Sequence, residues 1–183
     1  LLQIFSVFKT GIYFFTSPIY FINEKMITGD NMYFNNLKKI RNEKEITQKY
    51  IANILNVKRS TYNSWERGDV MIPLEIADKL SLYYKVRLSY IIGIDKKIKY
   101  INDIKEINYD TLLNNLNQLK KERHQSFTDI ANNIGCSRSI CHRYFNGVTI
   151  LPIDRLVLLA KLYNMDIDTL SSYPYCLLSH SIS

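Results

Sequence analysis

The sequence is poor in cysteine, proline and glycine: its 183 residues include three cysteines, four prolines and six glycines. Three cysteines are too few for the disulfide framework of a small secreted protein, so we expect a reducing, cytoplasmic setting. Cys136 and Cys141 lie near His142, but no second ligand pair follows at the spacing of a zinc finger or ribbon. We therefore expect no metal and no other cofactor, and we interpret both cysteines as small core residues.

Motifs of catalysis are missing too. The sequence has no His/Glu pair at metal-binding spacing, no glycine-rich phosphate loop and no nucleophile with an adjacent base. The histidines, His124, His142 and His180, stand alone and are interpreted as surface residues. The sequence therefore predicts a protein that is not an enzyme.

A long uninterrupted apolar run is also absent. Residues 1–22 are apolar and aromatic, but Lys9 and Pro18 interrupt them, and a lysine near the middle of a span costs about 3 kcal/mol on insertion scales. The segment lacks the basic start and the cleavage site of a secretory signal. We expect residues 1–31 to precede the physiological start, because the chain from Met32 reads like the beginning of a protein. A membrane anchor and an extra docked helix are the alternatives, and a membrane partner is not expected.

The charge that the chain carries is unevenly distributed. Its formal net charge is +7, and 46% of its residues are hydrophobic, which is enough for a real core. Residues 32–94 hold eleven Lys and Arg against six Asp and Glu, whereas residues 111–173 hold seven against five. A basic excess gathered in one segment fits a polyanionic partner such as DNA.

Two stretches of the chain are similar in sequence. Residues 37–91 align without gaps on residues 116–170 at an offset of 79, with eleven of 55 positions identical. The identical positions include "IAN" at 51–53 and 130–132. Self-similarity at a fixed offset predicts two copies of one structural unit.

Each copy is expected to hold five short helices, which in the first copy lie near 35–44, 48–55, 59–66, 74–84 and 88–93. Thr47 is placed to cap the second of these helices, and no alternating pattern predicts strands. We predict an all-α fold of two tandem five-helix domains, at 32–94 and 111–173. A charged linker at 95–110 joins them, and a tail follows at 174–183.

The second and third helices of each copy are predicted to form a helix-turn-helix. Asn56 and Gly135 fill the same slot between them, and both residue types tolerate a left-handed backbone. Four residues earlier both copies have alanine, which lets two helices cross closely. The outward face of the third helix offers Arg, Asn, Ser and Thr with no acidic residue, a composition typical of contacts with phosphates and base edges.

The motifs "ITQKYIANILNVKRSTYNSWERG" (46–68) and "VRLSYIIG" (86–93) resemble the phage-repressor-like helix-turn-helix family of Cro/CI or xenobiotic-response-element type. A weaker resemblance lies in "SFTDIANNIGCSRSICHRYFNG" (126–147). The family implies that a glutamine opening the second helix binds a phosphate and that the third helix reads bases in the major groove. It also implies an ion pair between Arg41 and Glu66.

The residues predicted to bind DNA in the first copy, from the resemblance and from the outward face of the third helix, are Gln48, Lys58, Arg59, Ser60, Asn63, Ser64 and Arg67. Lys58 departs from the usual Ser or Thr cap and is expected to contact a phosphate. In the second copy the corresponding basic face carries Arg138, Ser139, His142 and Arg143. There Phe127 replaces the glutamine, so this copy is either a second DNA-binding unit or a structural, dimerising one.

The expected function is a sequence-specific DNA-binding transcriptional regulator of bacterial or phage-like type, with double-stranded DNA as its partner. A homodimer and a small protein partner are both left open. The alternative is an antitoxin-type module, whose DNA binding serves autoregulation while another surface, such as the apolar tail at 171–183, holds a partner protein.

Overall fold

The computed structural model describes residues 36–174, and this range contains ten α-helices. They are α1 (Leu37–Glu43), α2 (Gln48–Ile54), α3 (Arg59–Arg67), α4 (Leu74–Tyr84), α5 (Leu88–Ile91), α6 (Tyr109–Glu122), α7 (Phe127–Ile134), α8 (Arg138–Phe145), α9 (Ile153–Leu162) and α10 (Ile167–Ser172). Within the described range there is no strand, and Val86 and Tyr100 form an isolated antiparallel bridge. The predicted all-helical fold is confirmed.

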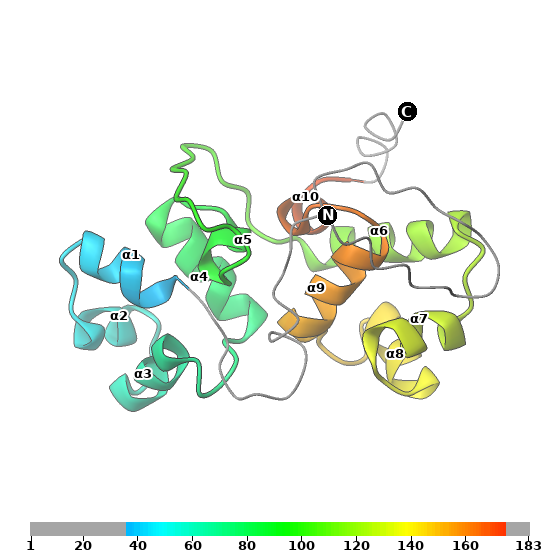
Figure 1. The fold of residues 1–183 in the computed structure, drawn as a ribbon, viewed down its shortest axis with the longest axis horizontal. Helices are drawn as coiled ribbons and strands as arrows, with labels where there is room; N and C mark the ends of the chain where they lie inside the picture. Colours follow the sequence, from blue (N-terminus) through cyan, green and yellow to red (C-terminus); the bar gives the residue numbers. More distant parts are fainter. Residues whose placement is uncertain (1–35, 175–183) are drawn as a thin grey trace, which may run out of the picture.

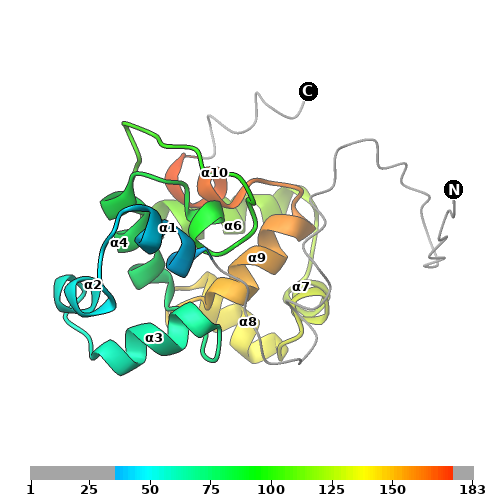
Figure 2. The same cartoon turned by 60° about the vertical axis from the view of Figure 1, so that its left-hand side comes forward.

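The helices form two groups that lie beside each other (Figure 1). We call α1–α5 the first group and α6–α10 the second group. The first is packed around Tyr62, Trp65 and Leu80, and the second around Leu116, Phe145 and Leu159, all of which are buried. Helices α3 and α8 lie at the same end of the molecule in two views (Figures 1 and 2).

Buried positions recur between the groups at the offset of 79 residues. Pairs in which both members are buried include Leu37/Leu116, Ile51/Ile130, Ala52/Ala131, Tyr62/Cys141, Trp65/Tyr144, Leu80/Leu159 and Tyr84/Tyr163. The second group has smaller side chains at two of these positions, Cys141 for Tyr62 and Tyr144 for Trp65, so the two cores are filled differently there. The inward stripes of corresponding helices therefore face their cores at the same register.

Left-handed backbone follows the same offset. The pairs are Glu45 (φ 55°) and His124 (φ 51°), Asn56 (φ 54°) and Gly135 (φ 65°), Gly68 (φ 74°) and Gly147 (φ 68°), and Lys85 (φ 54°) and Asn164 (φ 53°). This conformation is unfavourable for a residue with a Cβ atom. Left-handed backbone is therefore found at four pairs of positions that are 79 residues apart.

In each group an asparagine next to or within the first helix is hydrogen-bonded to the end of the last helix, a contact that was not predicted from the sequence. We call these two contacts, of Asn36 and Asn115, the asparagine tethers. The side-chain amide of Asn36 donates to the carbonyl oxygens of Tyr90 and Asp95, at 2.8 and 2.9 Å. The side-chain amide of Asn115, at the equivalent position, donates to those of Leu170 and Tyr173, at 2.8 and 2.7 Å. Each asparagine thus binds one carbonyl oxygen in the last helix of its group and one beyond the end of that helix.

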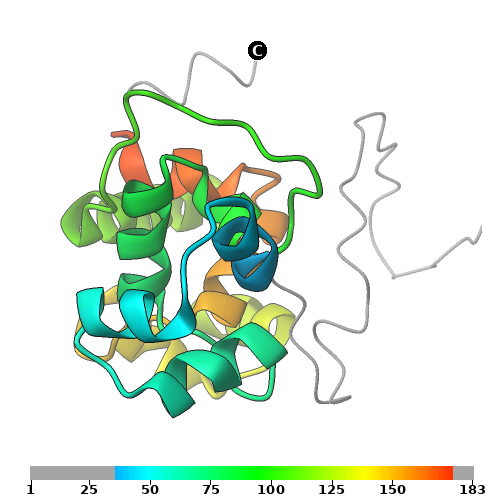
Figure 3. The ribbon, with the colours of Figure 1, turned by 90° about the vertical axis from the view of Figure 1, so that its left-hand side faces the viewer.

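The linker between the groups contains no helix before α6 begins at Tyr109. Its Tyr100 hydroxyl donates to Glu43 at 2.8 Å, and Lys44 lies over the Tyr100 ring at 4.2 Å. These contacts with α1 and the bridge to Val86 hold the linker against the first group. The linker runs at the end of the molecule opposite to α3 (Figure 3).

The N-terminal segment, 1–31, and residues 175–183 of the tail, with Cys176 and His180, lie outside the described residues. Among residues 36–174, no helix is long and apolar enough to cross a membrane.

Candidate nucleic-acid interface

Helices α2 and α3 are joined by a tight turn whose geometry agrees with the sequence prediction. The side chain of Thr47 accepts from the backbone N–H of Tyr50 at 3.2 Å and caps α2. At the other end Asn56 is left-handed, and the N–H of Val57 donates to the carbonyl of Ala52 at 2.9 Å. Ala52 is buried. The turn directs the chain into α3 directly after α2, as a helix-turn-helix requires.

Helix α3 divides its residues between the core and the surface. Tyr62 and Trp65 are buried, with ring centroids 6.4 Å apart. Of the predicted DNA-binding residues, Lys58, Arg59, Ser60 and Arg67 are exposed, while Asn63 and Ser64 are half-buried. Lys58 occupies the N-cap position without a side-chain cap, as predicted. Arg67 forms an ion pair with Asp69, and Gly68 ends the helix.

The buried end of α3 is braced by an ion pair. Arg41 donates to both carboxylate oxygens of Glu66, with its Nε 2.5 Å from Oε1 and its Nη2 3.2 Å from Oε2. The Glu66 side chain is 1% exposed, and its hydrogen bond raises the pKa of Arg41. Arg41 also donates to the carbonyl oxygen of Ile46 at 2.8 Å. The implied Arg41–Glu66 pair is thus present, and it fixes α3 to α1.

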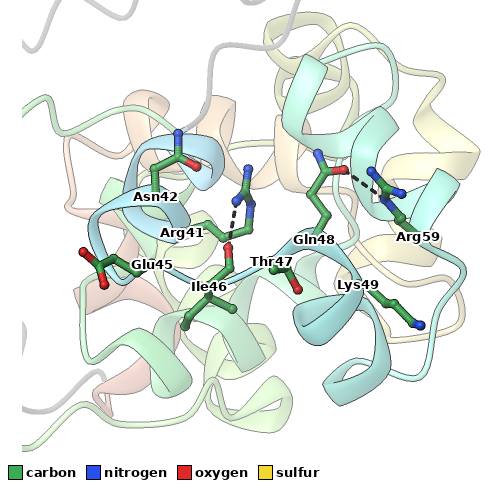
Figure 4. A pocket seen from close by; sticks show the side chains of 8 residues that line it. All are labelled: Arg41, Asn42, Glu45, Ile46, Thr47, Gln48, Lys49 and Arg59. Carbon is green, nitrogen blue, oxygen red and sulfur yellow. Dashed lines mark hydrogen bonds between the residues drawn. The ribbon is translucent and has the colours of Figure 1, made fainter.

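Gln48 connects this brace to the outward face of α3. Its Nε2 donates to Asn63 Oδ1 at 3.0 Å and to Glu66 Oε2 at 2.9 Å. Its Oε1 accepts from Arg59 Nε at 3.4 Å. Figure 4 shows Gln48 and Arg59 facing each other beside a hollow of about 700 Å³, which is lined by the end of α1, the turn that follows it, the first turn of α2 and Arg59. Both N–H groups of the Gln48 amide are therefore used inside the protein.

The second group has a corresponding turn, with a complete set of caps. Ser126 and Asp129 form a capping box at the start of α7, and the hydrogen bonds from Ser126 lower the pKa of Asp129. Gly135 ends α7, and a Cβ there would lie 3.3 Å from Nη1 of Arg155. Ser137 then caps α8 by accepting from the N–H of Ile140. Ser137 stands at the position of Lys58, so the cap that Lys58 lacks is present here.

Helix α8 presents its four predicted residues, Arg138, Ser139, His142 and Arg143, to solvent. Arg143 Nε donates to the Thr149 hydroxyl at 3.0 Å. His142 packs edge-on against Phe127, with ring centroids 5.0 Å apart. Arg138 and Ser139 begin the helix as Arg59 and Ser60 begin α3. The two exposed faces therefore share their first residues and differ one turn later.

The brace of the second group has a different chemistry. Phe127 packs edge-on against Phe145 at 5.5 Å, and Lys120 Nζ lies 4.4 Å from the centroid of the Phe127 ring. These three residues occupy the positions of Gln48, Glu66 and Arg41. A cation over an aromatic pair thus replaces a carboxylate that is bound by both a guanidinium and an amide.

The cysteines of the second group are half-buried at Cys136 and buried at Cys141. Burial raises the pKa of Cys136 and raises that of Cys141 to about 11. In the described part of the chain, no three His, Cys, Asp or Glu side chains are grouped as metal ligands.

The geometry of the first group has a counterpart among known families. Residues 37–91 match a protein-family model described as Helix-turn-helix. Over 73 residues the chain is 29% identical to the cryptic phage CTXphi transcriptional repressor RstR of Vibrio cholerae, a match that takes in 37% of this chain and 66% of that repressor. No solved structure matches the chain. These similarities support a DNA-binding regulator of the repressor-like helix-turn-helix type, and the family match covers the first group alone.

Proposed function

We propose that this protein is a sequence-specific DNA-binding transcriptional regulator that reads the major groove with α3. The observation that carries the proposal is the outward face of α3: Arg59 and Ser60 are exposed at its start, and Asn63 is held by Gln48 one turn later. Arginine, asparagine and serine side chains match the donor and acceptor patterns of base edges. The +5 balance of residues 32–94, eleven basic against six acidic residues, adds attraction to phosphates.

The finer proposal is that residues 32–94 and 111–173 are two copies of one helix-turn-helix unit, joined by residues 95–110. The repeated burial, the paired left-handed turns and the two asparagine tethers support it. In this interpretation Lys58 and Arg67 contact the DNA phosphates. Gln48 positions the side chains that face the bases, which are Arg59, Ser60, Asn63 and Ser64. A regulator of this kind acts in the cytoplasm and is not an enzyme.

The test begins with selection of bound duplexes from a random pool. Arg59→Ala is then measured against the selected site and a scrambled one. Loss of a bidentate contact to guanine removes about 1–3 kcal/mol of discrimination, so the mutant should bind the two duplexes more equally. Lys97→Ala, an exposed lysine of the linker, is the matched control and should leave discrimination unchanged. If Arg59→Ala discriminated between the selected and scrambled duplexes as strongly as the unchanged protein does, base reading by α3 would be rejected.

The antitoxin alternative differs by a protein partner. Co-purification of a small second protein that stays bound to the chain at high salt, when DNA has dissociated, would favour it over a free-standing regulator.

A further inference from the structure

The two groups meet where α5 and α10 begin, and this junction contains an unusual cap. Helix α5 has no side-chain cap of its own. Instead Asp168 Oδ1 accepts from the backbone N–H of Leu88 at 2.7 Å, and Asp168 Oδ2 accepts from that of Ser89 at 3.1 Å. A carboxylate of the second group therefore satisfies the first N–H groups of a helix in the first group.

An arginine completes the junction. Arg87 forms an ion pair with Asp166, and its Nε lies 3.4 Å from Asp168 Oδ2. Burial of Asp168 raises its pKa, an effect that the charge of Arg87 opposes. Nearby, Asp78 Oδ2 accepts from the N–H of Ile107 at 3.2 Å, so α4 also holds the chain just before α6.

The contacting residues are equivalent positions of the repeat. Residue 87 corresponds to residue 166, and residue 89 to residue 168, at the offset of 79. When equivalent patches of two like units face each other, the units are related by a local twofold axis, as in an isologous dimer. The junction of α5 with α10 has this arrangement, although both patches belong to one chain.

The two contacting patches carry opposite charges, Arg87 in the first group and Asp166 with Asp168 in the second. These charges determine which groups can pair with each other. Two first groups meeting in this way would place Arg87 against Arg87, and two second groups would place Asp166 against Asp166 and Asp168. Like charges at an interface disfavour the wrong pairing by several kcal/mol. The pairing of the first group with the second is the one that places Arg87 against Asp166 and Asp168.

We propose that the chain is a single-chain heterodimer of helix-turn-helix units, which binds one asymmetric, two-part DNA site as a monomer. The proposal rests on the function proposed above and extends it to α8. Helices α3 and α8 lie at the same end of the molecule in three views (Figures 1, 2 and 3), and the α5–α10 junction fixes one group against the other. One duplex can then contact both helices.

The exposed residues define what the two half-sites share. Arg59 and Ser60 in α3 match Arg138 and Ser139 in α8, whereas Asn63 and Ser64 are replaced by His142 and Arg143. The site is therefore an imperfect inverted repeat. The bases facing the two arginine–serine pairs are alike in both halves, and the bases facing the next helical turn differ.

The first test is stoichiometry on the selected duplex. Native mass spectrometry of the full chain with DNA should give one chain per duplex, and footprinting should show two unlike half-sites about 34–36 Å apart. Inserting about five base pairs between them rotates one half-site by half a helical turn and should lower affinity about 100-fold, to that of a single half-site. Two chains on a symmetric site, or no effect of the insertion, would overturn the proposal.

The second test alters the junction. Arg87→Asp should remove the spacing requirement and keep binding to the first half-site, whereas Arg87→Lys, which keeps a positive charge opposite Asp166, should retain the requirement. Asp166→Asn serves as a milder variant, to be used if the reversal lowers helicity by circular dichroism. An unchanged spacing requirement in a folded Arg87→Asp or Asp166→Asn variant would overturn the junction's role. If the unchanged protein bound no duplex at all, the proposed function itself would be rejected.

Discussion

Phe127 and His142 pack edge-on with ring centroids 5.0 Å apart, at the two positions where the first group has Gln48 hydrogen-bonded to Asn63. The neighbouring positions change with them, from Arg41 and Glu66 to Lys120 and Phe145. A buried carboxylate needs a cationic partner, and an aromatic ring in its place does not. The two networks are therefore alternative ways of fixing the third helix, and their members are compatible only as a set.

When Arg41, Gln48 and Glu66 are replaced by their counterparts from the second group, the changes in the free energy of unfolding should be non-additive. Glu66→Phe alone leaves the guanidinium of Arg41, whose side chain is 12% exposed, without its carboxylate, and we expect a loss of about 3 kcal/mol. Adding Arg41→Lys and Gln48→Phe should recover at least half of this loss. Urea unfolding followed by the fluorescence of Trp65, the chain's single tryptophan, measures it. The exposed carboxylate Asp103, which lies in no helix, offers a control, since Asp103→Asn should change stability by less than about 0.5 kcal/mol. Additive effects of the three substitutions would contradict the coupling.

Asp78 should make the protein less stable as the pH rises. Burial raises its pKa to about 6 from the ordinary 3.8, so the folded state binds the proton more tightly than the unfolded state. Stability is then lost between about pH 4 and pH 6. Asp78→Asn keeps an acceptor for the N–H of Ile107 and should stabilise the protein by about 1–3 kcal/mol at pH 7 and not at pH 3.5. Thermal unfolding at the two pH values measures the difference.

A matched substitution at an exposed carboxylate should change stability at pH 7 in the direction opposite to that of Asp78→Asn. Asp110 lies in the first turn of α6, where its charge favours the helix. Asp110→Asn should lower stability by about 0.5 kcal/mol at pH 7. A gain from Asp110→Asn equal to that from Asp78→Asn would show that the effect reflects overall charge and not burial.

Sequence reasoning predicted the elements that depend on local signals. The five helices of the first group, the left-handed turn at Asn56 and the Thr47 cap follow from helical periodicity and from the residue types that these positions require. The Arg41–Glu66 pair came from the family resemblance and is present. The contacts of the linker with the first group, which Tyr100 makes with Val86, Glu43 and Lys44, are tertiary and have no local signal.

The contacts that sequence reasoning missed are tertiary. The asparagine tethers join residues 54 or more positions apart, and nothing local distinguishes Asn36 or Asn115 from a surface asparagine. The offset of 79 was known, however, and it places asparagine at both positions. The opposite charges of residues 87 and 166 could likewise be read from the alignment. Their contact could not, because a repeat does not specify how its copies pack.

Lys58 separates stability from binding. Lys58→Ser introduces the cap that Ser137 provides for α8, and we expect a gain of about 1 kcal/mol in stability. The same change removes a positive charge from the proposed interface. It should weaken binding to all duplexes alike and lower the salt slope by about one. Ser137→Ala, the complementary control, should cost about 1 kcal/mol and leave the salt slope unchanged. A salt slope that is unaltered in Lys58→Ser would exclude a phosphate contact.

Gln48 distinguishes two roles for the start of α2. The family resemblance implies a phosphate contact, whereas the structure uses both N–H groups of the Gln48 amide to hold Asn63 and Glu66, and its oxygen accepts from Arg59. If Gln48 positions these side chains, Gln48→Ala should bring affinities for the selected and scrambled duplexes closer together, because Arg59 and Asn63 lose their common support. If it binds a phosphate, both affinities should fall by the same factor. We expect the first result, and Gln48→Glu, which retains an acceptor for Arg59 but not the donors to Asn63 and Glu66, should relax the preference too. If both variants instead lost affinity for the two duplexes by the same factor, Gln48 would be assigned to a contact with the DNA backbone.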